Sequence, residues 1–372
     1  MAVLDFTKAT LGFGLMRLPR GENGQIDIEV TKTLVDEYMK SGFTYFDTAF
    51  GYPGSEDAFR QCVAQRYPRE SYILATKLTG FAIHRESELR DAINISLQRT
   101  GAEYIDYYLL HSVSRDSDAR IYSKNNLWEF GRHLRDEGKI RYFGFSYHDK
   151  ADYLEELLES HPDVDFVQLQ INYLDWEDTN VESRKCYEAA RKYNKPIIVM
   201  EPNKGGVLAT SLPQSVLDIF KTVNPNASGA SWAMRFVASL PGVAVILSGM
   251  NTLEQMRDNT AFMKNVELLT EEEKEAIIKA REWLLSMDLI QCTSCKYCLE
   301  GCPVNIQIPR IMNPLNRYTM FSNLEDAKFL YNMAAQNGGK ASECEDCGIC
   351  ETICPQHIPI RQNLKKAVKL FE

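Results

Sequence analysis

The stretch ELRDAINISLQRTGAEYIDYYLLH, residues 88–111, contains the pattern that decides the fold. Its first half is amphipathic at helical spacing and ends at Gly101, a residue that readily takes the left-handed conformation in which helices stop. After a short connection, the apolar and aromatic run Tyr107–His111 is typical of a buried strand. A helix that leads directly into a buried strand is the repeating unit of a parallel sheet.

The same alternation of helical and β-rich runs extends from residue 10 to about residue 285. Further helices are predicted to stop at Gly42 and Gly138. The eight predicted strands are Thr10–Gly14, Tyr45–Thr48, Tyr72–Lys77, Tyr107–His111, Tyr142–Ser146, Phe166–Gln170, Ile197–Glu201 and Val243–Ser248. Because eight parallel strands with intervening helices close into a barrel, the sequence predicts an α/β fold of the (β/α)8, or TIM-barrel, type.

The barrel is predicted to end near residue 286. Its last helix opens with a capping box, in which Thr270 and Glu273 would each accept a hydrogen bond from the other's backbone N–H group. Near Met287 the sequence changes to cysteine groups separated by a polar helical spacer at about 309–336. We therefore expect a barrel domain over residues 1–286 and a small, mainly helical domain over residues 287–372.

Eight of the ten cysteines form two copies of one motif. Each copy reads C-x2-C-x2-C-x3-C-P, and the copies comprise Cys292, Cys295, Cys298 and Cys302, then Cys344, Cys347, Cys350 and Cys354. Three thiolates at this spacing can surround one 4Fe-4S cluster, while the fourth reaches the neighbouring cluster. The expected sets are therefore Cys292, Cys295, Cys298 and Cys354 for one cluster, and Cys344, Cys347, Cys350 and Cys302 for the other.

Two zinc sites are the alternative interpretation, because four thiolates also suit tetrahedral zinc. Zinc sites usually show paired C-x2-C knuckles, so the third cysteine and the proline of each motif favour iron–sulfur clusters. The segment resembles bacterial two-cluster ferredoxins, which implies a ferredoxin-like domain that transfers single electrons at low potential. The remaining Cys62 and Cys186 lie in helical runs and are expected to be buried structural thiols.

The composition excludes several other classes of function. Apolar residues make up 44% and charged residues 25% of the chain, as is ordinary for a globular protein with a large core. The net charge of −9, without a Lys/Arg cluster, argues against nucleic acid or an anionic membrane surface as a partner. Because the sequence shows no secretory signal and no apolar run of about 18 residues, a cytoplasmic protein is expected.

Polar residues end most of the predicted strands. A core strand gains nothing from ending in a charged side chain, because burying an unpaired charge is costly. The C-terminal strand ends of a TIM barrel instead face its active site. The strand-end residues that are predicted to surround this site are Asp47, Lys77, His111, Ser146, Gln168, Glu201 and Ser248.

Tyr52 can join Asp47, Lys77 and His111 in one constellation, because it follows Asp47 by five residues. The pKa of a tyrosine is ordinarily about 10, so a tyrosine that donates a proton at neutral pH needs a nearby cation to stabilise its anion. Lys77, paired with Asp47, could provide that cation. His111 could then hold a substrate carbonyl oxygen by a hydrogen bond.

Several stretches resemble the aldo-keto reductase family: GFGLMRLP (12–19), FDTAFGY (46–52), ATK (75–77), GKIRYFGFS (138–146) and the stretch quoted first. The resemblance covers residues 10 to about 265, and the cysteine motifs extend it to the branch in which a ferredoxin-like module follows the barrel. It implies that Tyr52 is the general acid and that Asp47 and Lys77 tune it. It also implies that His111 orients the carbonyl for hydride transfer from a nicotinamide.

The resemblance further implies where the nucleotide binds. Ser146 and Gln168 would bind the carboxamide, and the loop after Ser248, with Asp258 and Asn259, would hold the adenosine end. The remaining nucleotide contacts would be Gly14, Met16, Met200, Glu201, Pro202, Lys204, Gly205, Gly249, Met250 and Gln255.

The sequence departs from the family pattern in three respects. Tyr147 follows Ser146 where the family often has Asn, so one carboxamide contact could be lost. Gln255 stands where many members carry an Arg for the 2′-phosphate, and Gly249 stands where some carry a Lys, so either NAD or NADP is expected. Met200 lies near the position of the aromatic residue that usually stacks on the nicotinamide. Its presence could make room for a larger ring, such as a flavin.

The sequence thus predicts an oxidoreductase that reduces a small carbonyl compound, or oxidises an alcohol, with NAD or NADP, and whose two clusters exchange electrons with a redox partner protein or second centre. A nicotinamide passes two electrons as hydride whereas each cluster takes one, which leaves open a flavin, a one-electron substrate or a structural role for the clusters. The alternative function is an electron-transfer protein whose barrel binds a flavin or docks a redox partner without nicotinamide-dependent carbonyl reduction.

Overall fold

The computed structural model describes residues 9–83, 85–179, 181–321, 323–336 and 338–372. Eight parallel strands close into a barrel in sequence order, with β1 paired to both β2 and β8. The strands are β1 (Thr10–Gly14), β2 (Tyr45–Asp47), β3 (Ile73–Leu78), β4 (Ile105–Val113), β5 (Ile140–Tyr147), β6 (Phe166–Gln170), β7 (Ile197–Met200) and β8 (Val243–Ser248). The predicted TIM barrel is confirmed, because every strand lies within two residues of its predicted bounds.

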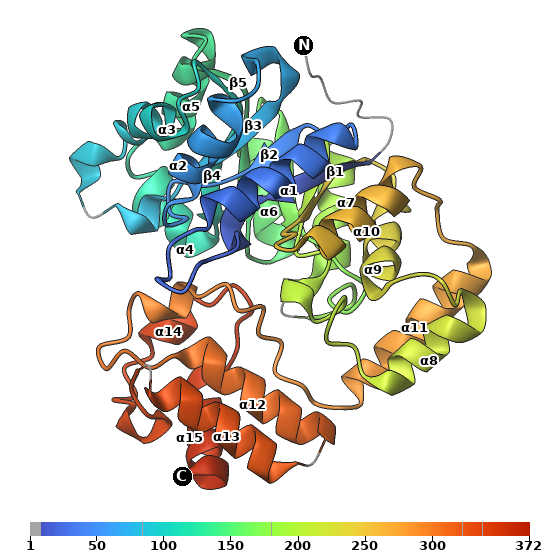
Figure 1. Ribbon diagram of the computed structural model, residues 1–372. Helices are drawn as coiled ribbons and strands as arrows, with labels where there is room; N and C mark the ends of the chain where they lie inside the picture. The colour runs from blue at the N-terminus through green and yellow to red at the C-terminus, as the bar shows by residue number, and fades with distance from the viewer. Residues whose placement is uncertain (1–8, 84, 180, 322, 337) are drawn as a thin grey trace. The chain divides into compact units, whose positions relative to one another are not determined.

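Helices lie outside the strands of this barrel (Figure 1). They are α1 (Ile28–Lys40), α2 (Ser55–Phe59), α3 (Ala92–Thr100), α4 (Arg115–Ser117), α5 (Leu127–Asp136), α6 (Ala151–Ser160), α7 (Ser183–Lys192), α9 (Gly229–Ala238) and α10 (Leu253–Lys264). Helix α1 illustrates why they form: the Asp27 side chain caps the backbone N–H of Val30, and Leu34, Val35 and Tyr38 are buried at helical spacing.

The barrel has an inner and an outer core. The inner core contains Tyr45, Tyr107, Phe166 and other strand residues, and the larger outer core packs between the strands and the helices. The inner layers fit because Gly144 lacks a side chain: a Cβ atom there would lie 2.4 Å from the carbonyl oxygen of Phe166. The barrel interior is therefore a packed apolar core, and the polar groups lie at the ends of the strands.

The chain divides into two compact units whose bounds differ from the expected domains. One unit runs up to Pro202 and includes Ser231–Leu269, and the other comprises Asn203–Ala230 and Thr270–Glu372. The segment that follows β7 therefore groups with the cysteine motifs. The predicted division at residue 287 remains a prediction.

The second unit is helical. It contains α8 (Gln214–Val223), α11 (Glu271–Leu285), α12 (Ile308–Phe321), α13 (Leu324–Gln336), α14 (Ile349–Thr352) and α15 (Ile360–Phe371). Helices α12, α13 and α15 lie side by side (Figure 1) and enclose a core that includes Ile306, Leu315 and Leu364. The predicted capping box of α11 is confirmed, because the Thr270 hydroxyl accepts from the N–H of Glu273 at 3.2 Å and the Glu273 carboxylate accepts from the N–H of Thr270 at 3.0 Å.

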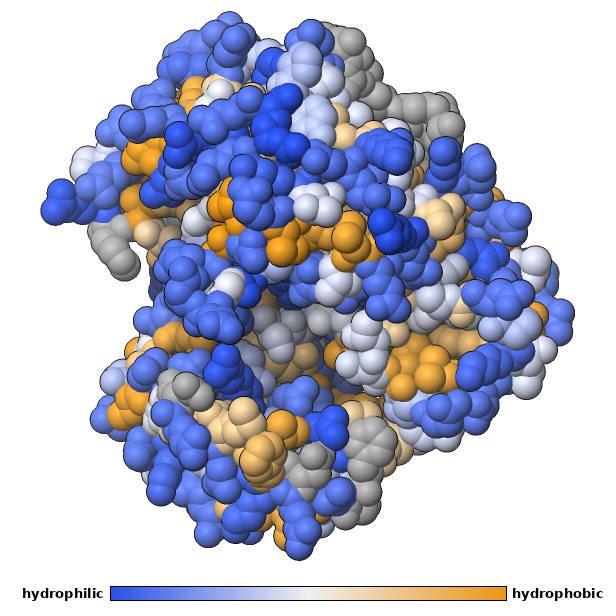
Figure 2. Space-filling model, viewed as in Figure 1, coloured by the Kyte–Doolittle hydropathy of each residue, from blue (hydrophilic) through white to orange (hydrophobic). Residues whose placement is uncertain are grey.

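The face of the molecule in Figure 2 is mainly hydrophilic, with apolar side chains in small groups. In the second unit the large exposed apolar side chains include Phe329 and Met333 on α13 and Ile349 and Ile353 at α14. Within the described part of the chain, none of the helices combines the length and the apolar character that crossing a bilayer requires.

Candidate active site and cluster-binding pockets

Three predicted catalytic side chains come from the ends of adjacent strands. Asp47 ends β2, Lys77 lies near the end of β3 and His111 lies in β4, and each side chain is almost fully buried. Tyr52 is half-buried in the loop after β2. The barrel brings all four together, because the Tyr52 ring lies 5.0 Å from the Lys77 ammonium and 5.5 Å from the His111 ring, measured to ring centroids.

Lys77 connects Asp47 to Tyr52. Its Nζ donates to Asp47 Oδ1 at 2.6 Å and to the carbonyl oxygen of Thr48 at 2.8 Å. Burial lowers the pKa of Lys77, and the charge of Asp47 opposes that shift. A cation held against the tyrosine ring in a water-poor site favours the phenolate over the phenol more strongly than the same cation would in water.

His111 is held by a residue that the sequence analysis did not identify. Its Nδ1 lies 2.7 Å from the Thr79 hydroxyl, which also accepts from the backbone N–H of Gly51 at 3.0 Å. Burial and the charge of Lys77 lower the pKa of His111 well below its usual value. The imidazole is therefore neutral at physiological pH and can donate only one N–H proton.

The residues expected at the nicotinamide carboxamide bond to other groups of the protein. Gln168 Nε2 donates to Asp47 Oδ2 at 3.2 Å, and the Ser146 hydroxyl accepts from the N–H of Ser112 at 2.7 Å. Both side chains are buried, so the structure brings them to the strand ends as expected. Their contact with a nucleotide remains a prediction.

The residues expected at the adenosine end lie on β8 and α10. Asn259 Nδ2 donates to the Ser248 hydroxyl at 2.7 Å, while Gln255 accepts from the backbone N–H of Asn251 at 3.0 Å at the start of α10. Met250 packs in the outer core and Asp258 is partly exposed.

The other expected nucleotide contacts divide between the two compact units. Gly14 and Gly249 face each other, since a Cβ on Gly249 would lie 3.7 Å from the carbonyl oxygen of Gly14. Glu201 pairs with Arg17 at 2.9 Å. Met16 and Met200 are half-buried and Pro202 is buried, all in the barrel unit. Lys204 and Gly205 belong to the unit of the cysteine motifs.

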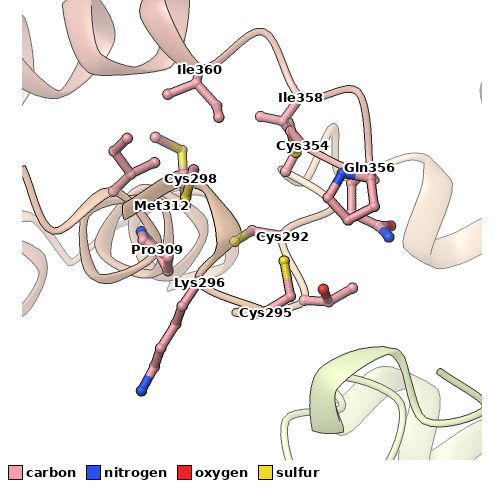
Figure 3. A pocket seen from close by; sticks show the side chains of 13 residues that line it. Cys292, Cys295, Lys296, Cys298, Pro309, Met312, Cys354, Gln356, Ile358 and Ile360 are labelled. Atoms are coloured by element: carbon pink, nitrogen blue, oxygen red, sulfur yellow. The ribbon is translucent and has the colours of Figure 1, made fainter. Parts of the chain in front are cut away.

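The cysteines surround two separate pockets in the sets that the spacing predicted. One pocket, of about 340 Å³, is lined by Cys292, Cys295, Cys298 and Cys354, and the other, of about 330 Å³, is lined by Cys302, Cys344, Cys347 and Cys350. The sulfur atoms of the first set surround a common space in Figure 3. Ile308 lines both pockets, so they are adjacent.

The two motifs also fold alike. Positive φ angles occur at equivalent positions of the two copies: Ser294 and Asp346, Lys296 and Gly348, and Asn305 and His357. Such angles are uncommon outside glycine, so their recurrence at matching positions reflects one backbone conformation used twice. The copies therefore build two equivalent cysteine-lined loops.

The donor groups of the pockets suit 4Fe-4S clusters. The backbone N–H of Ile306 donates to Cys302 Sγ at 3.3 Å. Burial raises the pKa of Cys354, and N–H groups of Ile358, Gln356 and His357 oppose that shift by donating to its sulfur. Four thiols, N–H donors and apolar walls are what thiolate-bound clusters require, because the iron charge offsets the cost of burying thiolates.

Cys62 and Cys186 lie apart from these pockets. Both are buried, and burial raises their pKa to about 11 and about 12, respectively. Such thiols are unreactive, as expected for packing residues.

The residues that the sequence analysis missed are Thr79 and Gln356. Thr79 follows Lys77 by two residues, so extending the search for polar residues slightly past each strand would have found it. Gln356 lines the first cysteine pocket and contacts Lys204, which precedes it by 152 residues. No local sequence pattern predicts the contact between Gln356 and Lys204.

Comparisons with known proteins agree with this architecture. A family model described as "Aldo/keto reductase family" matches residues 10–282, and one described as "4Fe-4S dicluster domain" matches residues 291–359. The second match favours iron–sulfur clusters over the zinc alternative. The uncharacterised oxidoreductase YqkF of Bacillus subtilis is 25% identical over 301 residues, which span 73% of this chain and 92% of that protein. The NADH-specific methylglyoxal reductase of Escherichia coli is 24% identical over 311 residues, spanning 71% and 92%.

Solved structures show the same barrel. The holo form of the aldo-keto reductase AKR11C1 from Bacillus halodurans superposes with a TM-score of 0.60 at 23% identity, covering 73% of this chain and 92% of that chain. An aldo/keto reductase from Klebsiella pneumoniae, in complex with NADP and acetate, superposes with a TM-score of 0.59 at 19% identity, covering 73% and 90%.

Proposed function

The chain belongs to the aldo/keto reductase family and carries a 4Fe-4S dicluster domain, and we propose an activity that uses both parts. We propose that it reduces a small carbonyl compound, or oxidises the corresponding alcohol, with NAD(H) or NADP(H), and that it exchanges single electrons with a redox partner protein through two 4Fe-4S clusters. The observation that carries the proposal is the convergence of Tyr52, Lys77, Asp47 and His111 at one set of strand ends.

In the reducing direction, a bound nicotinamide would supply a hydride to the carbonyl carbon. Tyr52 donates its phenolic proton to the carbonyl oxygen, so that this oxygen becomes the hydroxyl of the product alcohol and the phenolate is reprotonated from solvent. Lys77 stabilises that phenolate from beside the ring, and Asp47 keeps the buried lysine charged. In the oxidising direction the same phenolate accepts the alcohol proton.

His111 orients the substrate rather than transferring its proton. Its low pKa keeps it neutral, and a neutral imidazole is a hydrogen-bond donor that does not compete with Tyr52 as the acid. Its ring lies edge to face with Tyr52 at 5.5 Å, so both groups can reach the same carbonyl oxygen. The site therefore offers one acid and one orienting donor.

The eight motif cysteines would hold the two clusters, each of which would carry one electron at low potential. Ile308 lines both pockets, and the backbone N–H of Ile306 donates to Cys302 Sγ. The mismatch between two-electron hydride transfer and one-electron clusters suggests that a flavin, a second centre or a one-electron substrate joins the two reactions.

A second candidate function is an electron-transfer protein in which the barrel binds a flavin or docks a redox partner without nicotinamide-dependent reduction. Met200 favours it, because this residue is half-buried at the end of β7, where an aromatic residue is expected to stack on the nicotinamide, and it leaves room for a larger ring. The two functions make opposite predictions for Tyr52.

Replacing Tyr52 with Phe tests the proposal. The Tyr52→Phe variant keeps the ring over Lys77 but removes the proton, so kcat for aldehydes such as methylglyoxal should fall by roughly 100-fold or more with NADH or NADPH. The matched control is Tyr187→Phe, since the Tyr187 hydroxyl bonds to the carbonyl oxygen of Pro241 away from these strand ends. Iron and acid-labile sulfide, measured in anaerobically purified protein, should be unchanged in both variants. Turnover that survives in Tyr52→Phe with the clusters intact would leave only the electron-transfer function.

A further inference from the structure

A lysine is buried in the segment that follows β7 and groups with the cysteine motifs. Lys204 follows β7 by four residues, is 1% exposed and has a φ of 44°. Burying a lysine and placing it in the left-handed region are both costly, so surrounding contacts must hold it there. Its segment, Asn203–Ala230, belongs to the same compact unit as the cysteine motifs.

One contact of Lys204 comes from a residue of the first cysteine pocket. Lys204 Nζ donates to Gln356 Oε1 at 3.3 Å, and Gln356 follows the ligand Cys354 by two residues. Gln356 is buried and lines the pocket beside Cys354 (Figure 3). The ammonium group of Lys204 is thus one side chain away from that pocket.

The backbone next to Lys204 touches the other end of the same cysteine set. A Cβ atom on Gly205 would lie 2.4 Å from the carbonyl oxygen of Thr293, which follows Cys292 directly. Gly205 also has a φ of 65°, so both its space and its conformation favour glycine. The segment after β7 therefore contacts both loops that carry the cysteines of the first pocket, at Thr293 next to Cys292 and at Gln356 near Cys354.

Each pocket has one cation among the described residues that line it, and neither cation is buried. Arg361 lines the second pocket, but its side chain is 40% exposed and pairs with Glu351 at 2.9 Å and Asp346 at 3.5 Å. Lys296 lines the first pocket, but it is exposed and extends away from the sulfurs in Figure 3. Water screens both of these cations, whereas Lys204, which reaches the first pocket through Gln356, is shielded from water.

We propose that Lys204 is a positioning residue whose buried charge raises the reduction potential of the cluster held by Cys292, Cys295, Cys298 and Cys354 above that of the other cluster. The proposal rests on the two-cluster content proposed above. Reduction adds one electron from a one-electron donor and one negative charge to a cluster, with no bond made or broken. A nearby positive charge in a low-dielectric environment stabilises that added charge. The first cluster is then the one that accepts an electron first.

The test is an anaerobic redox titration of the full chain with dithionite, followed by electron paramagnetic resonance. In Lys204→Met the ratio of reduced to oxidised first cluster, at a fixed potential, should fall by roughly several-fold to tenfold, the size expected of one buried charge at an effective dielectric constant of about 20. The second cluster should be unchanged. Lys204→Arg, which keeps the charge, should stay near wild type, as should the control Lys221→Met on exposed helix α8. Cys295→Ser identifies which signal belongs to the first cluster.

Lys204→Gln provides a second variant, because it removes the charge but keeps a polar side chain that can bond to Gln356. It should lower the same potential, and it decides the matter if Lys204→Met fails to assemble its clusters. Unchanged potentials in a variant with full iron and sulfide, or equal shifts of both clusters, overturn the proposal. Wild-type protein that lacks iron and sulfide would instead overturn the proposed cluster content, on which this inference depends.

Discussion

At the scale of single residues, the contact between Thr79 and His111 bears on which nitrogen of His111 carries the proton. The Thr79 hydroxyl accepts from the N–H of Gly51 and has one proton that it can donate to His111 Nδ1, where the direction of the 2.7 Å contact depends on the tautomer. If Nδ1 accepts, a neutral histidine carries its proton on Nε2. We therefore expect Thr79 to favour the tautomer that can donate from Nε2 to a substrate oxygen.

Thr79→Val should lower kcat by about tenfold, because it keeps the shape of the side chain but removes the hydroxyl that favours this tautomer. The measurement is steady-state aldehyde reduction, with KM followed separately. Thr79→Ser restores a hydroxyl and should restore most of the rate. A loss of equal size in Thr79→Ser and Thr79→Val would mean that packing, and not the hydrogen bond, is what matters.

The low pKa of His111 predicts the pH dependence of the reaction. The neutral form is the one that orients substrate, and protonation removes it only as the pH falls through the folded pKa, well below 6.5. The value of kcat/KM should therefore stay flat from about pH 8 down to about pH 6. His148 also contributes charge near His111, so His148→Gln is the control. An acidic limb near pH 6.5 that persists in His148→Gln would contradict a neutral His111.

At the scale of secondary-structure elements, helix α11 depends on its first turn. Thr270 and Glu273 cap each other, and Glu273 also accepts from Asn224 Nδ2 at 3.1 Å, just after α8. The helices α8 and α11 pack together in the second unit. The capping box therefore fixes both the start of α11 and its attachment to the neighbouring helix.

Thr270→Ala should lower the free energy of local opening of α11 by about 1 kcal/mol, the usual cost of a lost N-cap. Hydrogen–deuterium exchange followed by mass spectrometry measures this in peptides from Glu271–Leu285. Thr222→Ala on exposed α8 serves as the control, because its hydroxyl bonds only within its own helix turn. Exchange in α11 as slow as in the wild type would show that the α8 contact, and not the cap, sets the helix start.

Elements with a strong local pattern could be predicted from sequence. The barrel strands are short apolar runs that follow helix-stopping residues such as Gly101 and Gly138, and both glycines adopt positive φ angles. The α11 capping box is equally local. The spacer predicted at 309–336 is helical, as expected, and consists of two helices, α12 and α13.

Contacts made across long stretches of chain could not be predicted. Lys204 looks like an exposed loop lysine in sequence, but in the structure it is buried and bonds to Gln356, 152 residues away. Thr79 could have been noted by its place just past β3, but its role depends on Gly51 and His111 from two other parts of the barrel. Local sequence patterns thus predict the reactive residues of a site, whereas the residues that hold them in place are identified only by tertiary contacts.

At the scale of the whole molecule, three of the motif cysteines belong to the hydrophobic core of the second unit. Cys298, Cys350 and Cys354 are buried among residues such as Ile306 and Leu364. Without iron, the two pockets would be lined by thiols instead of filled by clusters. A small helical unit with so much of its interior given to metal ligands should depend on the metal for stability.

Anaerobic removal of iron with a chelator should therefore unfold the second unit selectively. Hydrogen–deuterium exchange should lose protection in α12, α13 and α15, while the barrel strands keep theirs. The decisive peptide is Asn203–Ala230, which lies between barrel elements in sequence but groups with the cysteines in space, and it should lose protection together with the cysteine motifs. Adding iron and sulfide should restore all of these regions. If Asn203–Ala230 stayed protected with the barrel, it would be a barrel loop in energetic terms, and the contact between Lys204 and Gln356 would be too weak to couple it to the clusters.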